Sequence, residues 1–173
     1  LLYLTGYPDI SIEDLKNFRQ LGSKTAGHPE LGYLSGIETT TGPLGQGLAN
    51  AVGMALAERL LNNRFGNDIV DHFTYVVASD GDFQEPIVLG AGSMAGHWGL
   101  SRLIVYYDSN NAQISGNVDR SDSTNYAQVF EGFGWHVQEI DGHDHDQIRE
   151  AIEKAQVVDR PSLIIGTTVM AYG

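Results

Sequence analysis

Two short apolar runs, each followed by a polar turn, most constrain how this chain can fold. Residues 72–78 (HFTYVVA) and 103–107 (LIVYY) have the length and the aromatic and β-branched content of buried strands. A stretch long enough for a helix separates them, so we expect a β-α-β unit. Because a right-handed crossover makes the two strands parallel neighbours, the turns that follow them would meet at one edge of the sheet.

The two turns carry side chains that suit a metal ion. Asp80 and Gly81 follow the first run, and Asn110 and Asn111 follow the second. Either dipeptide alone is a common turn former and would be weak evidence. Together, at the ends of adjacent strands, Asp80 and Asn110 would supply one carboxylate and one amide oxygen. Mg²⁺ prefers oxygen ligands and keeps positions for phosphate and water, so we predict half of a site for Mg²⁺ or Ca²⁺ that a diphosphate completes.

The rest of the chain alternates helical and strand patterns, which is typical of an α/β domain. We predict a doubly wound, mainly parallel sheet with helices on both faces. The expected helices cover residues 11–21, 46–64, 86–98 and 146–157, and the expected further strands cover 135–140 and 162–169. Ser11 would cap the first helix, with Asp14 at its third position. Residues 22–41 have no sustained period, which favours a functional loop.

The composition limits the classes of function that this chain could have. With 173 residues and 42% hydrophobic residues, the chain can bury one ordinary core. A net charge of −12 argues against a nucleic-acid partner and predicts an acidic, solvated surface. No stretch approaches the length of a membrane span, so we expect no membrane partner. The absence of cysteine excludes disulfides and thiolate metal sites, and it fits a cytoplasmic enzyme.

Several loop residues have both a functional and a structural interpretation. The glycine-rich run 42–47 precedes a predicted helix, where it could let the backbone approach a ligand or simply form a tight turn. His28 lies in a polar loop and could exchange protons near neutral pH or cap a turn. Glu85 favours a helix N-terminus. In the run 141–146, with its two histidines and three aspartates, we favour Asp144 as a helix cap over a metal site.

Five motifs in order resemble transketolases. They are KNFRQL (16–21), GHPE (27–30), ETTTGPLGQG (38–47), DIVDH (68–72) and the pair SDGD (79–82) with NN (110–111). The last pair resembles the thiamine diphosphate motif, G-D-G followed by N-N, with Ser79 in place of the first glycine. The resemblance extends from about Leu4 to Tyr172. It implies an enzyme that uses thiamine diphosphate and a divalent metal to move a two-carbon ketol unit from a ketose phosphate to an aldose phosphate.

The resemblance also implies roles for individual residues. The metal ligands would be Asp80, Asn110 and the backbone carbonyl of Ala112. The residues in contact with the cofactor would be Gly42, Pro43 and Leu44 at its aminopyrimidine end, Gly81 and Asn110 at its diphosphate, and Ile114 near its rings. His28 would face the donor substrate and the reactive carbon. Glu85 would join a carboxylate network between the two active sites of a dimer.

We expect residues 1–173 to form a partial diphosphate-binding domain of a transketolase. Its upstream start, its downstream end and the pyrimidine-binding domain would be absent, so the segment alone would be inactive. Sugar phosphates would be the substrates, and the chain would form a homodimer or pair with a pyrimidine-binding domain. Two alternatives remain. One is another thiamine diphosphate enzyme, such as a dihydroxyacetone synthase or phosphoketolase relative. The other is a non-catalytic paralogue used for assembly, which Ser79 and the lack of upstream family histidines favour.

Overall fold

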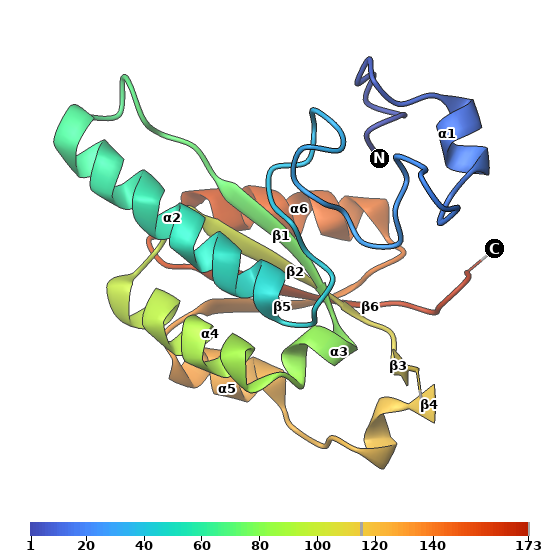
Figure 1. Ribbon diagram of the computed structural model, residues 1–173. Helices are drawn as coiled ribbons and strands as arrows, with labels where there is room; N and C mark the ends of the chain where they lie inside the picture. Colours follow the sequence, from blue (N-terminus) through green and yellow to red (C-terminus); the bar gives the residue numbers. More distant parts are fainter. Residues whose placement is uncertain (115, 173) are drawn as a thin grey trace.

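The computed structural model describes residues 1–114 and 116–172, and its centre is a parallel sheet (Figure 1). Within the described residues the sheet has four strands, in the order β1-β2-β6-β5. These strands are β1 (Thr74–Ser79), β2 (Leu103–Ser109), β6 (Ser162–Thr167) and β5 (His136–Asp141). Every neighbouring pair is parallel, which confirms the predicted sheet and the β-α-β unit.

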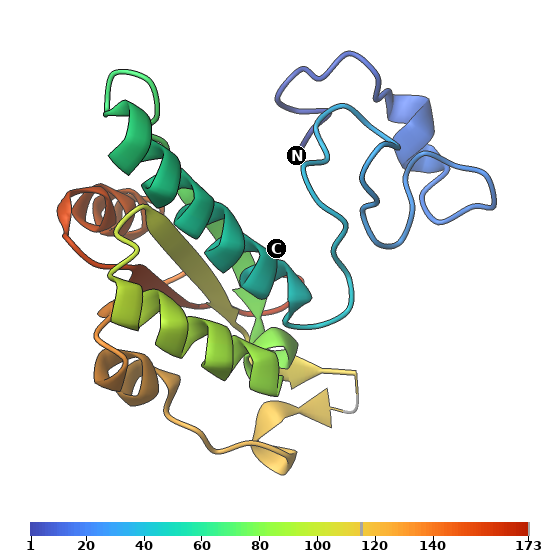
Figure 2. The same cartoon turned by 60° about the vertical axis from the view of Figure 1, so that its left-hand side comes forward.

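Helices cover both faces of the sheet, as a doubly wound fold requires. Helices α2 (Gln46–Phe65), α4 (Pro86–Trp98) and α5 (Tyr126–Gly132) pack on one face, and α6 (His145–Val157) covers the other (Figures 1 and 2). Successive side chains of β2 point alternately to the two faces. Leu103, Val105 and Tyr107 therefore enter the core under α2 and α4, whereas Ile104 packs with α6.

The predicted ends of the elements are partly right. Asp144 caps α6, because its Oδ1 accepts hydrogen bonds from the backbone N–H groups of Asp146 (2.9 Å) and Gln147 (3.1 Å). Ser11 and Asp14 form the predicted cap of α1 (Ile12–Lys16). The prediction that this helix continues to residue 21 was wrong. The Asn17 side chain caps the carbonyl of Glu13, and Arg19 adopts a left-handed φ of 63°, so the helix ends.

Several short elements carry too little pattern to be predicted. They are α3 (Asp80–Phe83), β3 (Ala112–Gln113), β4 (Gly116–Asn117), the 3₁₀ turn η1 (Val118–Arg120) and α5. The strand predicted for residues 162–169 is two residues shorter. The backbone N–H of Thr168 still donates to the carbonyl of Ser109 at 3.1 Å, whereas that of Val169 donates to Nε2 of His143. Strand β1 begins and ends later than predicted, and β2 extends to Ser109.

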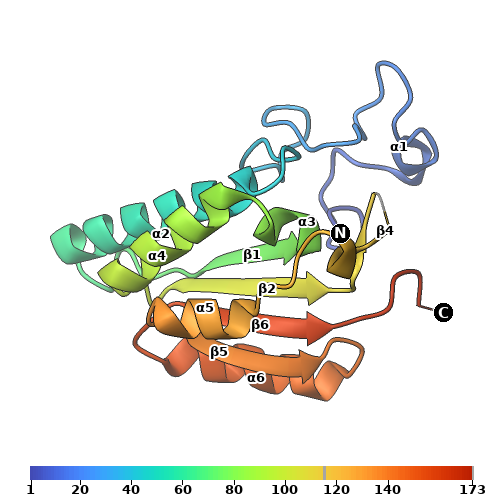
Figure 3. The ribbon, with the colours of Figure 1, turned by 90° about the horizontal axis from the view of Figure 1, so that it is seen from below.

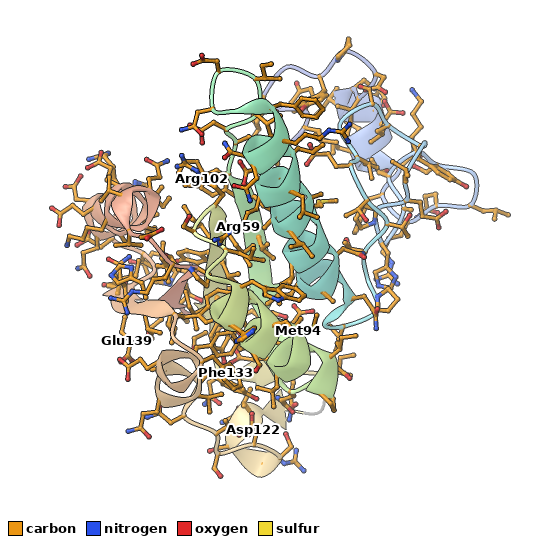
Figure 4. All side chains as sticks on the ribbon, turned by 90° about the vertical axis from the view of Figure 1, so that its left-hand side faces the viewer. Arg59, Met94, Arg102, Asp122, Phe133 and Glu139 are labelled. Carbon is orange, nitrogen blue, oxygen red and sulfur yellow. The ribbon has the colours of Figure 1, made fainter. Side chains whose placement is uncertain are left out.

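Side-chain hydrogen bonds also join helices and loops outside the sheet. Arg59 on α2 donates hydrogen bonds to the carbonyls of Trp98 and Gly99 at the end of α4. Arg59 and Arg102, both labelled in Figure 4, line the same hollow. The segment before α2 lies to one side of the sheet and is mostly irregular (Figure 2). Hydrogen bonds from Ser35 to the Asp9 carboxylate close part of this segment, and they lower the pKa of Asp9. None of the described helices combines the length and the apolarity that crossing a membrane demands.

An aromatic cluster fixes α3 against the sheet. Phe83 has no exposed surface, stacks on the ring of Tyr107 at 4.1 Å between centroids, and meets Tyr126 edge-on at 5.1 Å. Replacing Phe83 with alanine would leave a cavity in this cluster. We expect the free energy of unfolding to fall by about 3–5 kcal/mol, measured by urea denaturation. Phe65→Ala, at the exposed end of α2, is the control; an equal, small loss in both variants would contradict the packing argument.

Candidate functional site

The short helix α3 lies where β1 and β2 end, at the carboxyl end of the parallel sheet (Figure 3). Asp80 is the first residue of α3, and Asn110 directly follows β2. The backbone N–H of Asn110 donates to Oδ2 of Asp80 at 3.0 Å, and the Tyr107 hydroxyl donates to Oδ1 at 2.6 Å. The structure therefore brings together the two residues that the topology predicted to meet, through the backbone of Asn110 and the side chain of Asp80.

Burial protects the hydrogen bond between Tyr107 and Asp80. Desolvation raises the pKa of Tyr107 far above its ordinary value, and the hydrogen bond to Asp80 raises it further. Both causes favour the protonated hydroxyl, which is the form that donates to Asp80. The Asp80 carboxylate is the acceptor of this hydrogen bond.

A second carboxylate, Asp108, orients the Asn110 amide. Oδ2 of Asp108 accepts from Nδ2 of Asn110 at 3.2 Å, and its Oδ1 accepts from the Thr168 hydroxyl. The opposite oxygen of Asn110 accepts from the backbone N–H of Ala112 at 3.0 Å. Asn111 adopts a left-handed φ of 54°, which asparagine tolerates better than most residues. Asn110 thus contributes a polar side chain, whereas Asn111 forms the sharp turn that follows it.

The donor set at this edge fits a divalent cation. Asp80 is only 3% exposed, and within residues 1–114 and 116–172 no lysine, arginine or histidine forms an ion pair with it. A buried carboxylate without a cationic partner costs free energy that a bound cation would offset. Each oxygen of Asp80 accepts one hydrogen bond, so lone pairs remain for a metal. Carboxylate, amide and backbone oxygens are the ligands that Mg²⁺ and Ca²⁺ prefer.

The glycine-rich loop packs directly on α3. Gly45, at the N-terminus of α2, has a left-handed φ of 76°. A Cβ atom there would lie 2.7 Å from Cγ2 of Ile87 and 2.9 Å from Cβ of Glu85, so only glycine fits. The side chain of Leu44 lies over Gly81, 3.1 Å from where a Cβ would be. The loop and the turn after β1, both predicted to hold the cofactor, are therefore in contact.

His28 lies beside the same loop. A Cβ atom on Gly42, whose φ is 138°, would overlap the His28 ring. The His28 side chain is exposed, and no hydrogen bond from a described residue reaches it. The structure therefore gives no support to a turn-capping role. Thr41 donates its backbone N–H to the carbonyl of Pro29 at 3.3 Å, which ties the His28 segment to the glycine loop.

Glu85 and Ile114 lie at the outer limit of the site. Glu85 is the N-cap residue of α4 but makes no side-chain capping bond, and it is partly exposed. Ile114 is fully exposed, so among the described residues nothing covers it. Gln84 donates to Gln113 at 3.2 Å, which joins the turn before α4 to the segment that carries Ile114.

A cavity lined by described residues lies beside this site. It measures about 590 Å³, and its lining includes Gly42, Pro43 and Asp82 together with residues 74–78 of β1. Asp80, Asn110 and Ala112 do not line it. The cavity therefore adjoins the glycine loop without being the place where the predicted metal ligands converge.

Comparison with known proteins gives the same family as the motifs. The family described as "Transketolase, thiamine diphosphate binding domain" matches residues 1–173. The chain belongs to the transketolase family. Transketolase 2 of Escherichia coli is 55% identical over 178 residues, and the transketolase of Cereibacter sphaeroides is 53% identical over 171. These matches cover 100% and 99% of the chain and 26% of each relative.

Solved transketolases have the same fold. The crystal structure of transketolase from Campylobacter jejuni covers 92% of the chain at 49% identity, with a TM-score of 0.89. Transketolase from Leishmania mexicana covers 96% at 44% identity, with a TM-score of 0.92. The match covers 25% and 26% of those chains. The chain therefore spans about a quarter of the length of the transketolases it matches.

Sequence reasoning missed three residues of the site. Tyr107, Asp108 and Asp82 each hold a predicted ligand segment through a side-chain hydrogen bond. Asp108 stands out in the sequence only as a charge at the end of an apolar run. Asp82 belongs to the SDGD motif, but nothing in the motif indicates a contact with the glycine loop.

Proposed function

We propose that this chain is the diphosphate-binding part of a transketolase. The enzyme would move a two-carbon ketol unit from a ketose phosphate to an aldose phosphate. The observation that supports this most is the contact between Asp80, at the end of β1, and Asn110, at the end of β2, in a chain of the transketolase family. A transketolase of Pichia stipitis was crystallised in complex with sedoheptulose 7-phosphate, which is a ketose phosphate.

Different residues of the site would bind the metal and the different parts of the cofactor. Asp80, Asn110 and the carbonyl of Ala112 would hold Mg²⁺ or Ca²⁺, and Gly81 would lie against the diphosphate. The backbone of residues 42–44 would hold the aminopyrimidine, and Ile114 would pack near the rings. Bound thiamine diphosphate supplies a thiazolium that stabilises a carbanion. The chain itself binds and orients the cofactor.

The proposed site needs a second polypeptide surface. Leu44 and Ile114 are exposed although they are apolar and belong to the proposed cofactor contacts. An exposed apolar patch at a binding site is typical of an interface. We infer that a pyrimidine-binding domain, contributed by the partner in a homodimer or by another segment, covers this edge. Glu85 would then lie at the interface between two active sites.

A substrate panel tests the proposal on the complete enzyme that contains this chain. With thiamine diphosphate and Mg²⁺, xylulose 5-phosphate and ribose 5-phosphate should yield sedoheptulose 7-phosphate. Turnover only with formaldehyde as acceptor would instead indicate a dihydroxyacetone synthase. Formation of acetyl phosphate from donor and inorganic phosphate would indicate a phosphoketolase. Absence of both cofactor binding and turnover would indicate an assembly paralogue.

His28 should act in turnover and contribute little to folding. Its exposed ring accepts and donates no hydrogen bond among the described residues, so His28→Ala removes little packing. We expect a melting temperature within about 1 °C of the wild type, because exposed substitutions rarely change stability. The rate of ketol transfer should fall about 10²-fold or more, as expected for loss of a proton-transferring group.

His97→Ala, on α4, is the control. A large loss of stability with the activity per folded molecule retained would instead favour a structural role.

A further inference from the structure

Asp82 makes contacts that its place in a four-residue helix does not require. Its Oδ2 accepts from the backbone N–H of Ser79 at 2.9 Å and from the Ser79 hydroxyl at 3.0 Å. These two bonds close the first turn of α3. Its other oxygen, Oδ1, accepts from the backbone N–H of Gly45 at 2.8 Å. One carboxylate thus serves both its own helix and a residue 37 positions earlier in the chain.

The bond to Gly45 has no substitute in the structure. Among the described residues it is the one hydrogen bond that joins residues 42–47 to α3. The other contacts between them are van der Waals contacts, such as that of Leu44 with Gly81. Glycine residues have wide conformational freedom, so a loop with three of them needs an anchor to keep one backbone geometry. A ligand held by the backbone requires that geometry before it binds.

We propose that Asp82 is a positioning residue for the cofactor. Its carboxylate fixes the glycine loop, which would hold the aminopyrimidine end, relative to α3, which begins at the metal ligand Asp80. The cofactor would span both segments, so the spacing between them determines how well the two ends bind together. This inference rests on the proposed function, because it concerns the same site. Asp82 itself would touch neither the metal nor the cofactor.

The test compares thiamine diphosphate binding by Asp82→Ala and by the wild type, in the complete enzyme at saturating Mg²⁺. We expect the Kd for the cofactor to rise about 10-fold or more, which is usual when a residue that orients binding groups is removed. The KM for xylulose 5-phosphate at saturating cofactor should change less than the Kd. Hydrogen exchange of the Gly45 amide, measured without cofactor, should accelerate. The milder variant Asp82→Asn keeps the size of the side chain and should show an intermediate effect.

Asp144→Ala is the matched control. Asp144 also accepts backbone hydrogen bonds at a helix N-terminus, but it lies beyond β5 at the far edge of the sheet. This variant should lose thermal stability without a change in the Kd for the cofactor. Wild-type affinity in both Asp82 variants, with unchanged exchange at Gly45, would overturn the inference. A wild-type enzyme that binds no thiamine diphosphate would instead refute the proposed function.

Discussion

Replacing Asp80 with alanine is expected to abolish metal-dependent binding of thiamine diphosphate. Asp80 is the only carboxylate in the proposed ligand set, and among the described residues it is buried without a cationic partner, so the proposed cation would offset the cost of its charge. Without it, Asn110 and a backbone carbonyl would remain, and neither carries the charge that attracts a divalent ion. In the complete wild-type enzyme, thiamine diphosphate with Mg²⁺ should raise the melting temperature, as any ligand specific for the folded state does. In Asp80→Ala this rise should disappear.

The effect must be separated from simple unfolding. Asp80→Ala leaves the Tyr107 hydroxyl and the backbone N–H of Asn110 without their acceptor, at about 1–3 kcal/mol for each donor, but it also removes a buried charge, which offsets part of this cost. The melting temperature without ligands should therefore change only modestly. Asp80→Asn keeps the shape and removes the charge, and it should also lose the ligand-induced rise. A wild-type Kd for the cofactor in either variant would rule out Asp80 as a metal ligand.

The 173-residue chain alone should show no ketol transfer. The resemblance to transketolases implies that activation of the cofactor needs a glutamate against its pyrimidine ring, and that the pyrimidine-binding domain would supply this glutamate. Activation also needs a site closed to water. The described residues offer an open edge instead, with Leu44 and Ile114 exposed to solvent. Activity should therefore fall to the uncatalysed background.

The corresponding experiment expresses residues 1–173 and supplies thiamine diphosphate, Mg²⁺, xylulose 5-phosphate and ribose 5-phosphate. Circular dichroism first establishes that the chain is folded. Addition of a separately expressed pyrimidine-binding domain from a related transketolase should restore turnover, and the same domain added to an Asp80→Ala chain should not. Turnover by the isolated chain would contradict the proposed division of the active site.

The sequence predicted the parts of the fold that depend on local pattern. Apolar runs of strand length marked β1 and β2, and a helical period marked α2 and α6, because burial selects these patterns directly. The meeting of Asp80 with Asn110 followed from the handedness of the crossover. The length of α1 was mispredicted because its end depends on the left-handed conformation of Arg19, and arginine is not a typical signal for it.

The supporting contacts of the site could not be predicted in this way. Asp82 reaches Gly45 across 37 positions, and Asp108 reaches Thr168 across 60. No local period encodes such pairs, since they depend on how loops that are distant in the sequence are arranged in the folded chain. Short elements such as α3 and α5 are joined by the ring contacts of Phe83 with Tyr126 and Phe130, which a local pattern does not reveal. For these residues only tertiary structure reveals the partners.

The most direct measurement is anomalous diffraction from Mn²⁺ in crystals of the complete enzyme grown with thiamine diphosphate. Mn²⁺ takes the same oxygen ligands as Mg²⁺ and scatters anomalously. We expect one peak within coordination distance of an Asp80 carboxylate oxygen, Oδ1 of Asn110 and the backbone carbonyl of Ala112, with the diphosphate completing the shell. Clear density for bound cofactor with the manganese peak on other residues, or with no peak near Asp80, would contradict the proposed metal and diphosphate site.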